Sequence, residues 1–566
     1  MSAIGQGDTG AASADSPTAR QPTGDRFGSW SSSVPTTGGI VMTICRSTGR
    51  VPRLPPAGES GSAGLRGKDL VIARAGRGHR EGGAGSLTER RWRLLGATAI
   101  GAFIAPFDGS VVAIALPKIG PALHLSFVGA LWVQLSYLLV LTVALIPAGR
   151  LADLWGGLRL YRIGLVVFAL ASAAAGASTS TAWLLAARCI QGLGAALLSA
   201  TSTALVTEAF PEAERGKALG LNVTAVYLGL ALGPALGGLL TEQVGWRSIF
   251  YVNIPVAAAS LWWGWRLTSE RHAERHSARA RLDLPGVGLL VGALAAGMVG
   301  VSLAPIWGWS AVSSLALMVG GAAGVIGLVA YESRRSEPFL DVGLFRRNRL
   351  FATANFAALA NYMAFAAVTV LTSVFLEVVS GRSPEQAGLL LIAAPAAMVA
   401  LSWLAGRASD VVGSRWLASG GMAIIGAGLI MLSKLPAQPS MTGLIGDLTI
   451  VGVGMAAFSS PNTSAVMGSV PRAQLGVASG TLGTMRFLGQ TLSIGVLGAL
   501  ATSRLGAGGQ AVLLTGRAQG TSAASAYVAG YHLAMVAGAG IAVVGAIASL
   551  TRPGHGKVLR PPSGQA

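Results

Sequence analysis

Two charged residues of opposite sign stand inside long apolar stretches of this chain. Asp108 lies in the stretch that begins at Leu94, and Arg188 lies in a later one. A carboxylate inside an apolar membrane segment costs free energy, so it either pairs with a cation or takes up a proton. Burial favours the protonated form and a nearby cation favours the ionised form, which are the two states of a proton carrier. Asp108 is therefore predicted to carry a proton, with a purely structural carboxylate as the alternative.

Arg188 is the expected partner of Asp108. At a rise of about 1.5 Å per residue, Asp108 lies about 15 Å from Lys118 at one end of its segment. By the same measure Arg188 lies about 8 Å from that end of its own segment. An extended arginine side chain spans this difference in depth. An arginine that only reaches toward the membrane surface, without a coupling role, is the alternative.

Two short polar islands form a second pattern. GRLADLWGGLR begins at Gly149, and GRASDVVGSR begins at Gly406. Their aspartates, Asp153 and Asp410, could hold neighbouring segments together through charge pairs or at a helix N-terminus. Charges that only fix the orientation of the chain in a membrane are the alternative interpretation.

The segments that carry these residues are predicted to be membrane-spanning helices. Only 11% of the 566 residues are charged, 52% are hydrophobic, and the mean hydropathy is +0.59. Soluble proteins average about 25% charged residues, and about 20 apolar residues span a bilayer as a helix. We therefore expect an all-α integral membrane protein with fourteen transmembrane helices. The expected spans are residues 95–117, 129–148, 160–179, 183–206, 218–241, 248–267, 285–305, 311–331, 350–377, 386–405, 416–434, 442–466, 476–500 and 528–550.

The basic residues predict how these spans are oriented. The formal net charge is +19, and most Lys and Arg in the joints fall on one side, as in Arg266–Arg281 and Arg334–Arg349. Basic joints remain in the cytoplasm, so both termini are expected there, with the protein in the plasma (inner) membrane. Topology accounts for the charge, and no nucleic-acid partner is expected.

An internal repeat predicts the domain organisation. FPEAERGKALG at Phe210 matches VPRAQLGVASG at Val470, with nearly the same separation as the two islands. Two matching pairs in the same order indicate duplicated halves of six helices, related as parallel repeats. We expect a disordered tail at residues 1–88, a six-helix bundle at 89–270, two additional helices at 283–333, a second six-helix bundle at 345–552, and a cytoplasmic tail at 553–566.

Six short motifs occur in order along residues 94–552. They are FDGSVVAIALP, GRLADLWG, RCIQGLGAA, GLALGPALGG, WRSIFYVNIP and SGRSPEQAG. Together they resemble the major facilitator superfamily, and in particular its fourteen-helix drug:proton antiporter branch (EmrB/QacA type). The resemblance implies two pseudo-symmetric bundles that rock around a central cavity, with alternating access for a small molecule.

The resemblance also implies roles for individual residues. For proton coupling it indicates Asp108, Arg188 and Gln191. For a cytoplasmic gate it indicates Gly149, Asp153, Gly156, Arg159 and Asp410. An antiporter helix motif comprises Gly229, Gly233, Pro234, Gly237 and Gly238, for which general packing by small residues is the alternative.

The first island departs from the family pattern. Leu154, Gly157 and Leu158 stand where arginine or lysine is usual. The gate is therefore expected to be weaker, or to close through Arg159 and Arg162.

Further polar and aromatic residues suit a pathway for an amphiphilic substrate. The candidates are Phe107, Tyr137, Tyr227 and Glu377. No Gly-Lys dipeptide completes a G-xxxx-GK-[ST] phosphate loop, so the sequence does not support an ATP-driven pump. We expect no cofactor, no metal and no enzymatic activity, because the proton motive force would drive transport.

These observations predict a monomeric, proton-coupled antiporter that exports drugs or other amphiphilic molecules, with protons and a small-molecule substrate as its partners in the bilayer. An uncoupled facilitator, and a transport-inactive sensor or partner-binding protein on the same scaffold, are the alternatives.

Overall fold

The computed structural model describes residues 68–125, 127–265, 283–335, 342–505 and 522–552. Ala73–Ala566 form one compact unit. The expected tails lie outside the described residues, except that helix α1 already begins at Lys68. The helix thus reaches into the segment expected to be disordered.

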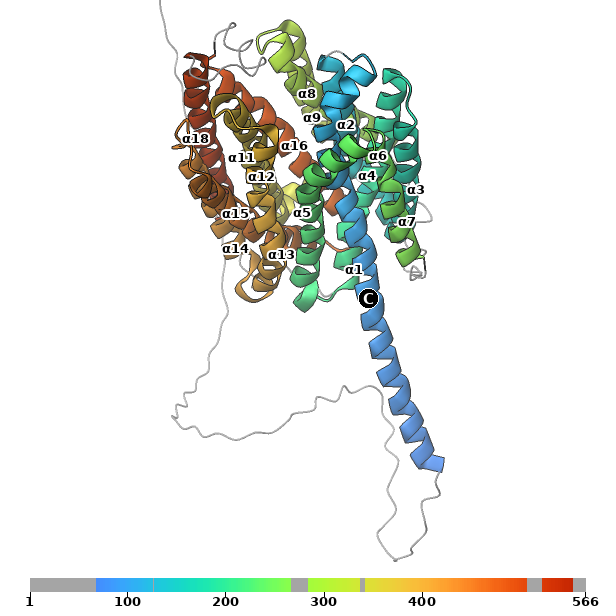
Figure 1. Ribbon diagram of the computed structural model, residues 1–566. Coiled ribbons are helices and arrows are strands. Elements are labelled where there is room, and N and C mark those ends of the chain that lie inside the picture. The colour runs from blue at the N-terminus through green and yellow to red at the C-terminus, as the bar shows by residue number, and fades with distance from the viewer. Residues whose placement is uncertain (1–67, 126, 266–282, 336–341, 506–521, 553–566) are drawn as a thin grey trace, which may run out of the picture. The chain divides into compact units, whose positions relative to one another are not determined.

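The described residues form helices that gather into two groups (Figure 1). The first group comprises α1 (Lys68–Ala122), α2 (Phe127–Trp155), α3 (Gly157–Gly176), α4 (Thr181–Ala209), α5 (Glu212–Gln243), α6 (Ser248–Tyr251) and α7 (Asn253–Gly264). The second comprises α11 (Arg349–Val374), the π-helical turn Phe375–Val379, α12 (Pro384–Leu391), α13 (Ala393–Val412), α14 (Ser414–Leu432), α15 (Met441–Gly468), α16 (Leu475–Thr502) and α18 (Ser522–Leu550). Between them in sequence lie α8 (Leu284–Trp307), α9 (Val312–Glu332) and the short α10 (Val342–Arg347).

Twelve helices among the described residues are long and apolar enough to cross a membrane. Two of the fourteen expected spans are not among them. The segment expected at 248–267 is divided into α6 and α7, so neither piece is long enough alone. The segment expected at 476–500 is the 28-residue α16, which carries Arg486 and several threonines and serines among its apolar residues.

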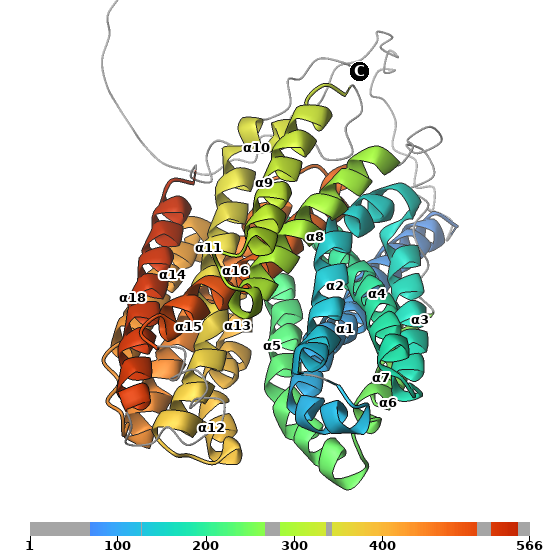
Figure 2. The ribbon, with the colours of Figure 1, turned by 90° about the horizontal axis from the view of Figure 1, so that it is seen from above.

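Paired helices join the two groups along a seam. In it α2 packs against α16, and α5 packs against α13. The hairpin of α8 and α9 lies beside one flank of this seam, because α8 contacts both α2 and α16 (Figure 2). Each group also has its own core of buried apolar side chains.

The duplicated sequence corresponds to duplicated local structure. Gly156 and Gly413, at corresponding positions of the two islands, have φ of 93° and 90° and precede α3 and α14 as their N-caps. Only glycine adopts such a backbone conformation without strain. Each island therefore ends one helix, turns sharply and starts the next.

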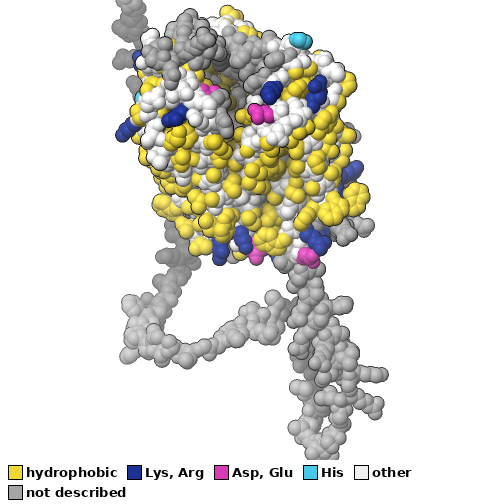
Figure 3. Space-filling view, viewed as in Figure 1, with side chains coloured by type: hydrophobic (Ala, Val, Ile, Leu, Met, Phe, Trp, Pro, Cys, Tyr) yellow, Lys and Arg dark blue, Asp and Glu magenta, His cyan; other side chains and the backbone are white. Residues whose placement is uncertain are grey.

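Apolar side chains cover the outer faces of the helices. Leu170, Ile326 and Val543 are 67%, 70% and 53% exposed. Figure 3 shows hydrophobic side chains across the middle of one face and charged side chains near its two ends. So broad an apolar surface is compatible with lipid rather than water around the helices.

Candidate functional site

A closed polar network surrounds Asp108 inside the first group of helices. The carboxylate accepts hydrogen bonds from Arg188 Nη1 at 2.5 Å, Gln191 Nε2 at 2.8 Å and Asn253 Nδ2 at 2.8 Å. These side chains come from α1, α4 and α7, and all four are fully buried. The expected contact between Asp108 and Arg188 is therefore present, as a buried ion pair.

The Arg188 guanidinium has further partners that fix its position. Its Nε donates to the carbonyl of Val133 at 3.0 Å, and its Nη1 also donates to Gln191 Oε1 at 2.7 Å. Its carbon lies 4.3 Å from the ring centre of Tyr137. A buried ion pair is stable only when additional hydrogen bonds satisfy the remaining donors and acceptors, and this network supplies them.

Three donors on one carboxylate suit its ionised form, which can only accept hydrogen bonds. Adding a proton to Asp108 would remove its attraction for Arg188 and leave a buried guanidinium without a counterion. An uncompensated buried charge of this kind destabilises a protein by about 3–5 kcal/mol. The ion pair and its hydrogen bonds therefore hold α1, α4 and α7 together as long as Asp108 is ionised.

The two islands make a second site, at one end of the seam. Asp153 in α2 accepts hydrogen bonds from the backbone N–H groups of Gly476 at 2.7 Å and Val477 at 2.9 Å. Asp410 in α13 accepts from the N–H groups of Gly216 at 3.0 Å and Lys217 at 3.1 Å. We call these two reciprocal contacts the latch, because each connects an island of one half to the other half.

The acceptors of the latch are aspartates. The donors Gly476 and Val477 lie in the first turn of α16, where backbone N–H groups have no partner within the helix and the helix dipole favours a negative charge. Gly216 and Lys217 are the fifth and sixth residues of α5, so the interpretation of an island charge at a helix N-terminus matches the geometry of Asp153 only. Arg159 takes no part: it is exposed and forms no hydrogen bond or ion pair with any other described residue, and Arg162 instead donates to the carbonyl of Gly264 at 3.0 Å.

Glycines allow the backbones to meet at the latch. A Cβ at Gly149 would collide with the carbonyl oxygen of Gly476, and one at Gly406 would collide with that of Gly216. Both pairs cross the seam at equivalent places. The first glycine of each island is thus required for close approach between the halves.

The antiporter helix motif packs α5 against α1. A Cβ at Gly229 would lie 2.5 Å from the carbonyl oxygen of Phe103, and one at Gly233 would collide with Ser110. A Cβ at Gly237 would lie 3.1 Å from the Cα of Val111. Gly238 has no neighbour within 4 Å of such an atom, and Pro234 lies inside the helix. Three of the motif's residues therefore hold the helix that carries Asp108.

The expected pathway residues occupy different environments. Phe107 and Tyr137 are 2% and 1% exposed within the first half, and the Tyr137 hydroxyl donates to the carbonyl of Ala105 at 3.2 Å. Tyr227 is 3% exposed and lies at the seam. Glu377 is half-buried in the π-helical turn, where it accepts a 2.7 Å hydrogen bond from Ser373. The structure therefore does not bring these four side chains together.

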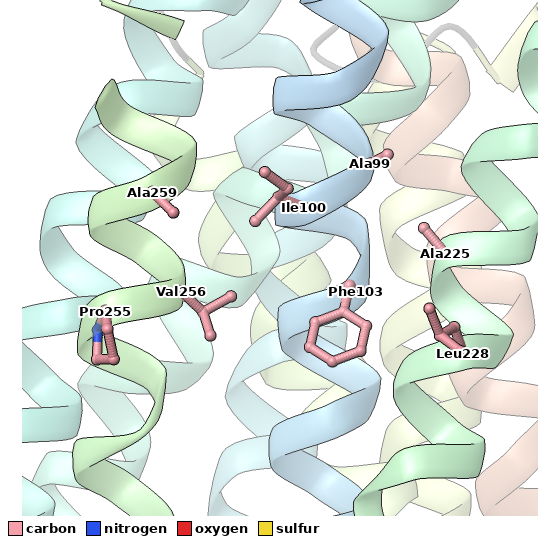
Figure 4. Close-up of a pocket in the computed structure, with 8 residues that line it drawn as sticks. All are labelled: Ala99, Ile100, Phe103, Ala225, Leu228, Pro255, Val256 and Ala259. Carbon is pink, nitrogen blue, oxygen red and sulfur yellow. The ribbon is translucent and has the colours of Figure 1, made fainter. Parts of the chain in front are cut away.

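An open apolar pocket of about 510 Å³ lies between α1, α5 and α7 (Figure 4). Its walls are Ala99, Ile100, Phe103, Ala225, Leu228, Pro255, Val256 and Ala259. Phe103 also stacks on Phe107, with ring centres 5.0 Å apart. Phe107 directly precedes Asp108 in the chain. The pocket offers only apolar contacts.

Sequence reasoning missed two contributors to these sites. Asn253 was part of a recognised motif, but a neutral amide among apolar residues carries no sign that it contacts a carboxylate. The N–H donors at Gly476 and Gly216 were visible only as members of a repeat. A repeat shows which residues correspond to each other. Here the contacts cross between the copies, because the island at Gly149 contacts the segment at Val470 and the island at Gly406 contacts the segment at Phe210.

Comparison with known proteins identifies the family. The family model described as Major Facilitator Superfamily matches residues 98–494. The chain belongs to the major facilitator superfamily. It is therefore a multi-pass membrane transporter and not an enzyme.

Relatives of this transporter include named export proteins. It is 37% identical over 412 residues to multidrug resistance protein Stp of Mycobacterium tuberculosis, covering 73% of this chain and 76% of Stp. It is 33% identical over 429 residues to the tetracenomycin C resistance and export protein of Streptomyces glaucescens, covering 75% of this chain and 78% of that protein.

A solved structure of the human organic anion transporter MFSD10 (TETRAN) shares the fold of this transporter. The TM-score is 0.57 at 16% identity, with 81% of this chain and 99% of that chain covered. At this identity the likeness concerns the fold alone.

Proposed function

We propose that this transporter is a proton-coupled antiporter that exports drugs or other amphiphilic small molecules by alternating access. The observation that carries the proposal is the buried ion pair of Asp108 and Arg188, with Gln191 and Asn253 completing it. Ionisable residues within membrane spans commonly serve proton relays. The printed names of the relatives, a multidrug resistance protein and an antibiotic export protein, support the direction and the class of cargo.

In this proposal the closed latch and the bound proton favour opposite conformations of the transporter. The closed latch belongs to the outward-facing state, with the islands on the cytoplasmic side, both termini in the cytoplasm and the chain in the plasma membrane. A proton that reaches Asp108 releases Arg188, and the first half then rearranges until the latch parts. The inward pull on each proton is about 2.3 kcal/mol per 100 mV of membrane potential. No cofactor takes part and the monomer is the transporting unit. The segment of α6 and α7, together with α16, completes fourteen spans.

The experiment measures proton-driven transport in proteoliposomes that contain the purified full-length protein. An imposed pH gradient drives uptake of rhodamine 6G or fluorescein against its concentration gradient, and Asp108→Asn is expected to abolish this movement. Asp447→Asn is the matched control, because Asp447 also lies in a membrane span but outside the network. The control is expected to keep the wild-type rate.

The alternatives give different results in the same assay. An uncoupled facilitator would move dye only down its gradient, at a rate indifferent to pH and unchanged in Asp108→Asn. A sensor would move neither dye. Either result would refute the proposed function.

A further inference from the structure

The second half contains an arginine, Arg486, that pairs with no acidic residue in the part of the chain that the structure describes. Arg486 lies in the middle of α16, about 16 Å from its start at Leu475 for a rise of about 1.5 Å per residue. Its Nη2 donates to Thr463 Oγ1 at 2.5 Å, and no ion pair joins it to an acidic residue among the described residues. The side chain is partly exposed. Its situation is thus the opposite of that of Arg188, which is buried and neutralised.

The acidic residues of the second half leave this charge unbalanced. Between residues 345 and 552 the sequence has four, namely Glu377, Glu385, Asp410 and Asp447. Asp410 is bound in the latch and Glu377 accepts from Ser373. Glu385 stands in the first turn of α12, and Asp447 is the seventh residue of α15, near the start of that helix. None of them therefore supplies a negative charge at the middle of α16.

Aromatic and hydroxyl groups from both halves surround the guanidinium. The carbon of the Arg486 guanidinium lies 5.9 Å from the ring centre of Tyr362 in α11. Tyr227, from α5 in the first half, lies beside Tyr362, Ser459 and Arg486. Its hydroxyl is buried and has no hydrogen-bond partner of normal geometry. Thr463 already donates to the carbonyl of Ser459 at 2.8 Å, so its oxygen serves as the acceptor for Arg486.

We infer that Arg486, Tyr227 and Tyr362 form a binding site for the anionic group of the transported molecule. The inference rests on the proposed function and names its substrate class, which is an amphiphile with a carboxylate or an ionised phenol. A guanidinium presents a planar fork of donors that matches a carboxylate, and aromatic rings beside it pack against an aromatic substrate. The buried hydroxyl of Tyr227, which lies beside Tyr362 and Ser459, would donate a hydrogen bond to the bound anion.

The site also belongs to the moving part of the molecule. Tyr227 comes from the first half, whereas Tyr362 and Arg486 come from the second. A bound anion would therefore contact both halves when the seam is closed around it and lose part of these contacts when the halves separate. Differential contact of this kind is what allows a ligand to bias two conformations.

The test compares two dyes that share a xanthene core, the anion fluorescein and the cation rhodamine 6G. Binding to the purified protein in phosphatidylcholine nanodiscs is measured by fluorescence polarisation at pH 7.4. Arg486→Gln is expected to weaken fluorescein binding at least tenfold and to change the Kd for rhodamine 6G less than threefold. Arg486→Lys, which keeps the charge but not the fork, should fall between Arg486→Gln and wild type.

Two further variants separate the site from general effects of charge and folding. Tyr227→Phe should weaken fluorescein binding about fivefold, as expected for one lost hydrogen bond. Arg504→Gln removes an exposed arginine at the end of the same helix and should leave both dyes unaffected. Monodisperse elution and an unchanged Kd for rhodamine 6G report that Arg486→Gln is folded.

The inference is wrong if wild type fails to bind fluorescein, or if Arg486→Gln binds it as wild type does. It is also wrong if the variant loses both dyes equally. Failure of the proposed function looks different, because it concerns Asp108. Asp108→Asn should still bind fluorescein, whether or not it transports against a gradient.

Discussion

The carboxylate of Asp153 in the first half accepts a 2.7 Å hydrogen bond from the backbone N–H of Gly476 in the second half. The reciprocal contact, from Gly216 N–H to Asp410 at 3.0 Å, connects the same two halves in the opposite direction. The Asp153 contact places the carboxylate at the first turn of α16, where the helix dipole stabilises a negative charge, and the Asp410 contact lies near the start of α5. The two contacts of the latch are thus formed by two copies of the same sequence motif.

Neutralising the latch should shift the transporter toward the conformation in which this end is open. Asp153→Asn keeps the size of the side chain but removes the charge, with a loss of about 1–2 kcal/mol. That loss corresponds to about a 5–30-fold change in the conformational equilibrium. Spin labels at the exposed positions Trp155 and Arg472 should report a longer distance in a larger fraction of molecules.

The second aspartate provides the internal comparison. Asp410→Asn should produce a shift similar to that of Asp153→Asn, and the double variant should shift further than either. Distances that match those of wild type in the double variant would contradict the assignment of the latch.

Adding a single methyl group at the latch should have a comparable effect without changing any charge. Gly149→Ala would force a Cβ into the carbonyl oxygen of Gly476, so the two backbones must separate. Gly498→Ala is the matched control in α16, because no atom lies within 4 Å of the added carbon. The spin-label distance should lengthen in the first variant only, and an equal response of both would argue against close packing as the cause.

Removal of both charges around Asp108 should be tolerated better than removal of one. Asp108→Asn leaves Arg188 buried without a counterion, which is expected to lower the unfolding free energy by about 3–5 kcal/mol. Asp108→Asn combined with Arg188→Gln removes that unpaired charge and should recover much of the loss. Thermal unfolding in detergent measures both, and transport against a gradient should be absent in both. Additive destabilisation would show that the two residues do not depend on each other.

Replacing Arg552 should stabilise the fold. This arginine follows the end of α18, is 1% exposed, and donates to Asn462 and Ser549, while its Nε and Nη1 have no partner among the described residues. Burial lowers the pKa of Arg552 to about 9, so the folded state disfavours the charged form. Because that pKa still lies above neutral pH, the side chain is charged and destabilising throughout the range from pH 6 to 8.

Arg552→Met should therefore raise the midpoint of thermal unfolding by a similar amount at pH 6 and at pH 8. The expected gain is about 1 kcal/mol or more, since a buried charge is exchanged for an apolar chain of similar length. Above about pH 9 the wild type loses its charge and the difference should narrow. A lower midpoint in the variant at pH 7 would indicate a stabilising role for the guanidinium.

The sequence predicted the ion pair of the first site but not the neutral side chains that surround it. An acid and an arginine in apolar segments of the same half have few ways to avoid an unpaired charge, so their contact could be predicted from depth. Asn253 and Tyr137 could not be predicted in the same way, because neutral and aromatic side chains are stable in many environments. Their roles depend on how α7 and α2 pack around the pair.

The latch illustrates a different limit. The islands and the segments at Phe210 and Val470 were recognised as repeats, but repetition within one chain does not say which copy contacts which. That assignment depends on the packing of α2 against α16 and of α5 against α13. Likewise, the sequence places Arg486 in the span expected at 476–500, but its lack of an acidic partner among the described residues depends on the positions of the neighbouring helices.

The hairpin of α8 and α9 makes the two flanks of the seam unequal. On one flank α8 contacts both α2 and α16. The hairpin therefore blocks the approach of a molecule dissolved in the bilayer from that side. The hairpin does not cover the opposite flank, where α5 packs against α13. A molecule that enters sideways from the bilayer is therefore expected beside α5, the helix that carries Tyr227 and two of the residues that line the apolar pocket.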